Sequence, residues 1–151
     1  MELPQVVAMA TGDDGQPAGY WRASNVLADG TNSVVDVSAL RSFVTTTSGS
    51  ASSLTARNGG TILSGSLGLV VRAALLMQPG GTLPTAQITN LVGGSVTVDG
   101  TAVDLSGLTS MGGVTLTVAN GGTANVSNVV NIDGANLYVS GGVLLSLPGV
   151  R

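Results

Sequence analysis

The sequence contains no cysteine, no histidine and no lysine, and each absence removes a class of chemistry. Without thiols and imidazoles there are no disulfides, no Ser-His-Asp or Cys-His nucleophiles and none of the common zinc sites. The five basic residues are all arginines scattered along the chain, so no basic stripe is available to neutralise nucleic acid phosphates. We therefore expect no catalysis, no cofactor, no metal site and no nucleic acid partner.

Charged and aromatic residues are scarce as well, at 9% and 3% of the 151 positions, whereas hydrophobic residues make up 43%. This balance favours a folded chain with an aliphatic core, because disordered chains combine low hydrophobicity with high net charge. No apolar run approaches the ~20 residues of a membrane-spanning helix, and the first residues lack the basic segment of a signal peptide. We expect no membrane insertion, and a chain that is either a mature form or a segment of a longer protein.

Glycine is abundant, at 23 residues, or about twice the ~7% of ordinary proteins. Short glycine turns followed by Thr or Val recur along the chain, which favours structural turns at regular intervals. The turn glycines are Gly60, Gly81, Gly100, Gly122 and Gly142.

A second motif, apolar-small-small-apolar, lies downstream of these turns. We place its copies at Val37, Leu67, Ile88, Leu105, Val126 and Leu147. The intervals are 30, 21, 17, 21 and 21 residues, which predict a repeat of about 21 residues with one shortened unit. The long first interval predicts an insertion of about nine residues in the polar tract 45–50.

Within the units, apolar and polar residues alternate in Ser95–Val98, Thr115–Val118 and Asn136–Val139. This pattern predicts strands with Val96, Leu116 and Leu137 on one face and Thr97, Thr117 and Tyr138 on the other. The segment 67–77 contains helix formers and is compatible with one helical turn, but we favour strand because the repeat runs through it.

Such short strands cannot each form a core, so they must stack on their neighbours. The units lack the leucine-rich repeat frame, and helical repeats need longer periods. We therefore predict an all-β fold, a parallel β-solenoid, as a right-handed β-helix with ~21-residue coils over residues 25–151. Residues 1–24 form an N-terminal cap or flanking segment. The last unit reads as truncated, so we expect further coils or end-to-end self-association as partners.

The Gly-Gly-Thr turns, Thr115–Val118 and Ala124–Val129 make the chain similar, from about residue 28 to 150, to the β-helical repeats of filamentous-haemagglutinin-like and autotransporter adhesins. The resemblance implies an extracellular or cell-surface location on a bacterium and a role as a structural spacer or adhesive shaft. It carries over no functional residue.

Candidate sites are few, and each has a structural alternative. Tyr20 and Trp21 suit a carbohydrate contact, as in a carbohydrate-binding or polysaccharide-lyase β-helix, or an end cap. Asp36 and Asp104 occupy equivalent positions, but three coils apart they are separated by roughly 14 Å, beyond the ~5–9.5 Å of glycosidase pairs. Stacked threonines leave an ice-binding face open as a weaker alternative.

The remaining acids and amides suit turns and corners rather than a metal site. Asp13 and Asp14 lack the series of oxygen ligands that calcium needs. Asp29, Asp99 and Asp133 directly precede glycine, where Asp bonds nearby backbone amides. We expect further amides to bond the next coil at the corners of the fold, namely Asn58, Asn120, Asn125, Asn128 and Asn131.

Overall fold

The computed structural model describes residues 6–11, 23–46 and 52–151, and in these residues the fold is all-β. The described residues form strands and turns but no helix. Every pairing between strands is parallel. The predicted all-β, parallel class is therefore confirmed.

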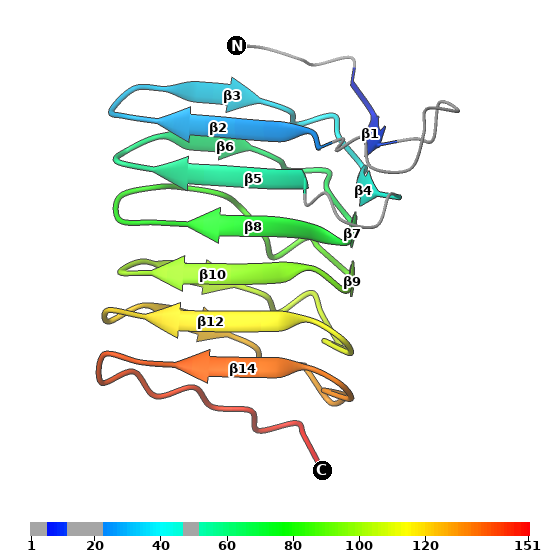
Figure 1. Ribbon diagram of the computed structural model, residues 1–151, viewed down its shortest axis with the longest axis vertical. Coiled ribbons are helices and arrows are strands. Elements are labelled where there is room, and N and C mark those ends of the chain that lie inside the picture. Colours follow the sequence, from blue (N-terminus) through cyan, green and yellow to red (C-terminus); the bar gives the residue numbers. More distant parts are fainter. Residues whose placement is uncertain (1–5, 12–22, 47–51) are drawn as a thin grey trace.

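The largest sheet has six strands, which lie across the long axis of the molecule and stack along it as a continuous ladder (Figure 1). Strands that are neighbours in this sheet lie 20 to 28 residues apart in the sequence, so each pass of the chain adds one strand. In order, the strands are β2 (Asn25–Asp29), β5 (Ser52–Arg57), β8 (Ala73–Met77), β10 (Ser95–Asp99), β12 (Thr115–Ala119) and β14 (Asn136–Val139).

Three smaller sheets complete the described fold. One has four strands in the order β1 (Ala8–Thr11), β4 (Ser42–Thr45), β7 (Leu69–Val71) and β9 (Asn90–Val92). Two have a pair each, β3 (Val34–Asp36) with β6 (Thr61–Leu63) and β11 (Ala102–Asp104) with β13 (Thr123–Asn125). Strands consecutive in the sequence belong to different sheets. Because β1 pairs with β4, part of the expected N-terminal cap lies on a sheet shared with the repeats.

Aliphatic side chains from successive strands lie over one another and form the core. Leu75, Val96 and Leu116 are in register and fully buried, and burial of each such side chain contributes about 1.5–3 kcal/mol. On the opposite face, Thr97 pairs with Thr117, and Thr117 with Tyr138. The predicted faces of these strands are therefore confirmed.

Two physical constraints require glycine at the turns. Gly81 approaches the carbonyl of Ala56 in the preceding unit so closely that a Cβ would overlap that oxygen, and Gly60 does the same over Ala28. Gly100 has a φ of 57°, in the left-handed region that favours glycine. All five predicted turn glycines lie outside the strands.

The repeat is more regular than the sequence motif indicates. In every unit a tight turn is closed by the amide of its fourth residue, and the first residues of these turns are Val37, Ser64, Thr85, Leu105, Val126 and Leu147. Their intervals are 27, 21, 20, 21 and 21 residues. The prediction that equivalent copies of the motif begin at Leu67 and Ile88 was wrong, as was the 17-residue unit, because Leu67 and Ile88 are the fourth residues of turns that begin at Ser64 and Thr85.

The misplacement has a chemical reason. Ser64 and Thr85 occupy positions that are apolar in the other units, yet both are buried. Each hydroxyl donates a hydrogen bond to the next unit, Ser64 Oγ to the Pro84 carbonyl at 2.9 Å and Thr85 Oγ1 to the Asp104 carbonyl at 2.5 Å. Because each buried hydroxyl has a hydrogen-bond partner, a polar side chain can take the place of an apolar one in the core.

The insertion lies where the sequence places it but is shorter than expected. Val44 pairs with Val71 and Ser52 with Ala73, so the first unit has six additional residues between these positions rather than nine. Residues 47–51 of this stretch lie outside the described residues. In the next unit the same connection is the single residue Arg72, whose φ of 50° ends β7 before β8 begins. The preference for strand over helix in the segment 67–77 is thus confirmed.

Candidate functional site

The corners that follow the strands of the six-stranded sheet carry a network of carboxylates and amides. Asp29 accepts hydrogen bonds from Arg57 Nη2 and from Asn58 Nδ2, both at 2.8 Å. Three corners after Asp29, Asn120 Nδ2 donates to Asp99 Oδ1 at 2.6 Å. Asp29 and Asp99 therefore bond side chains of the neighbouring unit, in place of the adjacent backbone amides that the sequence analysis predicts.

The hydrogen bonds to Asp29 also shift its titration. The Arg57 guanidinium, followed by the Asn58 amide, holds the pKa of the Asp29 carboxyl below its ordinary value. The other predicted corner amides make comparable bonds. Asn125 donates to Asp104 and Asn128 to the Ser106 carbonyl, while Asn131 accepts from Ser110 and donates to Asp133. The corner chemistry thus joins units and is structural.

Asp36 and Asp104 make the local backbone bonds expected of turn carboxylates. Asp36 accepts from the Ser38 amide at 2.8 Å, and Asp104 from the Ser106 amide at 3.0 Å. Hydrogen bonds from Ser38 and from Ser106, respectively, lower the pKa of the two carboxyls. Leu63 pairs directly with Asp36. Pro84 holds the equivalent position in the next unit, and Asp104 holds it in the unit after that. Two units lie between those of Asp36 and Asp104, so the carboxylates are three units apart, as predicted, which argues against a glycosidase pair.

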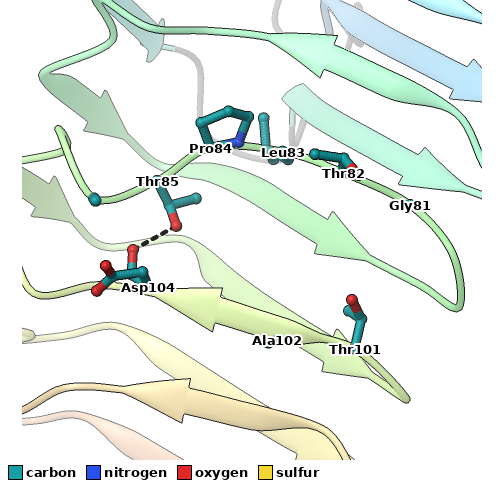
Figure 2. Close-up of a pocket in the computed structure, with 9 residues that line it drawn as sticks. Gly81, Thr82, Leu83, Pro84, Thr85, Thr101, Ala102 and Asp104 are labelled. Carbon is teal, nitrogen blue, oxygen red and sulfur yellow. Dashed lines mark hydrogen bonds between the residues drawn. The ribbon is translucent and has the colours of Figure 1, made fainter.

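An open groove of about 310 Å³ lies between the segment 81–86 and β11 (Figure 2). It exists because the strand ladder on this flank is interrupted. Thr82 makes one bridge to Thr61, but no strand pairing joins the segment 82–86 to β11 in the described residues. Pro84 has no N–H to give to a ladder, which explains why pairing stops here.

The two most polar groups of this groove are already engaged. The Thr85 hydroxyl points to the Asp104 carbonyl, as Figure 2 shows, and the Asp104 carboxylate accepts from Ser106 and from Asn125. A carboxylate held by two donors, with a depressed pKa, stays ionised and is poorly suited to proton transfer. We interpret this groove as a structural gap between stacked units.

A second open groove, of about 460 Å³, lies beside β7 and β9 and is lined by Arg41, Ser66, Gly68, Leu69, Thr89 and Asn90. This groove was not predicted from the sequence. The available signal is Gly68, a glycine outside the recurring glycine turns that leaves a space between longer side chains.

The outward face of the six-stranded sheet carries threonines but no extended array. Thr97 and Thr117 are neighbours, flanked by Leu76 on one side and Tyr138 on the other. The row of outward threonines is therefore interrupted on both sides, as the sequence indicates. This interruption does not favour an ice-binding face.

Several predicted residues cannot be placed. Tyr20, Trp21, Asp13 and Asp14 lie outside the described residues. Within the described part of the chain, no group of three or more acidic side chains is arranged to hold a metal ion. The same part contains no helix of the length and hydropathy needed to cross a bilayer.

Comparison of the chain with protein-family models, curated proteins and solved structures gives no match.

Proposed function

We propose that the chain is a parallel β-solenoid with coils of about 21 residues that wind with a right hand. The parallel pairing of all strands, the 20- and 21-residue registers from β5 onward and the alternation of sheets along the chain support this architecture. The right hand follows from the strong preference of parallel crossover connections.

We further propose that it serves as a structural spacer or adhesive shaft of an exported bacterial surface protein, without catalysis. The observation that carries this proposal is the unbroken six-stranded ladder along the long axis of the molecule. Its core repeats with every unit, and the carboxylates and amides at its corners are used to join units. The bacterial surface setting rests on the resemblance of the repeats to those of adhesins.

Removal of one whole coil tests the architecture. Leu105 and Val126 hold equivalent places, so deletion of residues 105–125 joins Asp104 to Val126 in the correct register. We expect this variant to fold and to be shorter by about 4.8 Å, measured by circular dichroism and small-angle X-ray scattering.

Deletion of residues 105–114 is the matched control, because it removes half a coil and puts the following residues out of register. It should unfold the units that follow. If the whole-coil deletion disrupts the fold as severely as the half-coil deletion, the stacked-coil architecture and the shaft function built on it are both wrong.

Carbohydrate binding is the second candidate function. The open groove beside β7 and β9, with its hydroxyl-bearing lining, favours it, and its volume of about 460 Å³ is of the size that small ligands occupy. Tyr20 and Trp21 supply aromatic rings of the kind that stack on sugars. Loss of retention on a glycan array after Trp21→Ala would support a contact there, whereas unchanged retention would exclude Trp21 from binding.

A further inference from the structure

The groove beside β7 and β9 arises from one residue without a side chain. Arg41, Gly68 and Thr89 lie over one another, because the Gly68 amide donates to the Arg41 carbonyl at 3.1 Å and the Thr89 amide to the Gly68 carbonyl at 3.0 Å. Stacked parallel positions are ~4.8 Å apart. Gly68 therefore leaves a hollow one unit wide between the side chains of Arg41 and Thr89.

The hollow is open rather than filled from elsewhere. A Cβ built on Gly68 would meet only Thr89 Oγ1, at 4.0 Å, and Gly68 does not have the positive φ that restricts a position to glycine. Neither close packing nor backbone conformation therefore explains the glycine at this position.

The groove has an uncompensated positive charge. In the described part of the chain, Arg57 is paired with Asp29 at 2.8 Å, whereas Arg41 is exposed and makes no ion pair. None of the described residues that line the groove is acidic. A guanidinium presents its N–H groups in a planar fork that matches a carboxylate in a two-point contact.

The rest of the lining is mostly neutral and hydrogen-bonding. Asn90 Nδ2 donates to Thr89 Oγ1 at 3.3 Å, so these two side chains are held together, and Ser66 adds a hydroxyl. Among the described lining residues, Leu69 is the one large apolar side chain. Such a surface suits a ligand rich in hydroxyl groups better than a fatty acid or a peptide terminus, which need a larger apolar wall.

We propose that this groove binds a carboxylate-bearing sugar, with the carboxylate on Arg41 and the ring hydroxyls on Ser66, Thr89 and Asn90. The site gives the carbohydrate-binding candidate a place on the described chain. Binding at this site can be tested independently of the shaft function, because the two coil deletions that test the shaft leave every named residue of the groove in place.

Calorimetric titration with a galacturonic acid dimer and with the neutral galactose dimer tests the proposal. The protein should bind the acidic dimer in preference to the neutral one, and Arg41→Gln should weaken that binding by about tenfold or more. Arg151→Gln removes the same charge from an exposed position outside the groove and should leave the affinity unchanged. Equal binding of the two dimers, or equal loss in both variants, would overturn the site.

A second variant separates the shape of the groove from its charge. Gly68→Val fills the hollow and is compatible with the backbone, so it should abolish binding while the melting curve stays unchanged. Acetate serves as the free-carboxylate probe. If acetate displaces the acidic dimer at the same concentration as galacturonic acid itself, the sugar contributes nothing and that part of the proposal is wrong.

Discussion

At the scale of single residues, the fold depends on the absence of side chains at the turns as much as on the aliphatic core. Gly60 and Gly81 each lie against a backbone carbonyl of the preceding unit, and Gly65 lies in open space. These positions share a residue type but differ in what a methyl group would meet. Abundance of glycine is therefore not by itself evidence of a constraint.

Gly81→Ala should destabilise the protein by about 1–3 kcal/mol, because its Cβ cannot fit beside the Ala56 carbonyl without a shift of backbone. Gly65→Ala is the matched control, and its effect should stay within ~0.5 kcal/mol. Urea unfolding measures both values. Equal stabilities of the two variants would show that adjacent units are not packed as closely as described.

Turn carboxylates should make the stability sensitive to acid. The pKa values of Asp29, Asp36 and Asp104 all lie below the ordinary value of 3.8 in the folded protein. Because the folded pKa is the lower one, their contribution is complete above about pH 4 and is lost as the pH falls through the folded pKa. Melting temperatures should therefore be level near neutrality and decline below pH 4.

Asp104→Asn checks the assignment of this acid sensitivity. The amide retains an acceptor for Ser106 but does not titrate, so the decline below pH 4 should become shallower. An identical acid slope in this variant and in the unaltered protein would remove Asp104 from the explanation.

At the scale of strands and turns, much of the fold could be predicted from the sequence, because alternation of residue type reports directly on which face is buried. Val96, Leu116 and Leu137 follow that pattern. Ser64 and Thr85 do not, since they are polar, and only their hydrogen bonds to the next unit make burial possible. A pattern of hydrophobicity contains no information about such distant partners.

The groove beside β7 and β9 could not be predicted for a related reason. Its members come from three successive units, and Arg41, Gly68 and Thr89 are individually unremarkable in the sequence. Their juxtaposition depends on the register of the turns, which the sequence motif misplaced by three residues at Leu67 and Ile88.

Strands of the same sheet should differ in local stability. Leu75 of β8 and Val96 of β10 are fully buried, whereas Leu137 of β14 is only partly buried and Val139 is 42% exposed. Hydrogen exchange monitored by mass spectrometry should show faster exchange in β14 than in β8 or β10. Uniform protection across the sheet would contradict independent stacking of units.

At the scale of the whole molecule, the exposed edge of β14 provides a surface for association. An edge strand with accessible apolar side chains tends to pair with another chain. We propose further coils or a second copy as its partner. Sedimentation velocity should show larger species at higher protein concentration, and Val139→Lys should suppress them.

Tyr138→Lys is the control for that experiment, because Tyr138 is also exposed but lies on the outward face of the same strand. It should leave self-association unchanged. Monomeric behaviour of the unaltered protein at all concentrations, or suppression by both substitutions alike, would argue against pairing through the β14 edge.

The interruption beside Pro84 has a mechanical consequence for the molecule. One flank consists of a continuous hydrogen-bonded ladder, while the flank containing the segment 82–86 lacks pairing at mid-length. The side without strand pairing has fewer backbone hydrogen bonds between units, so it resists deformation less than the continuous sheet does. We expect bending to concentrate there, so that a lateral force would bend the molecule by opening or closing this gap, while the six-stranded sheet stays intact.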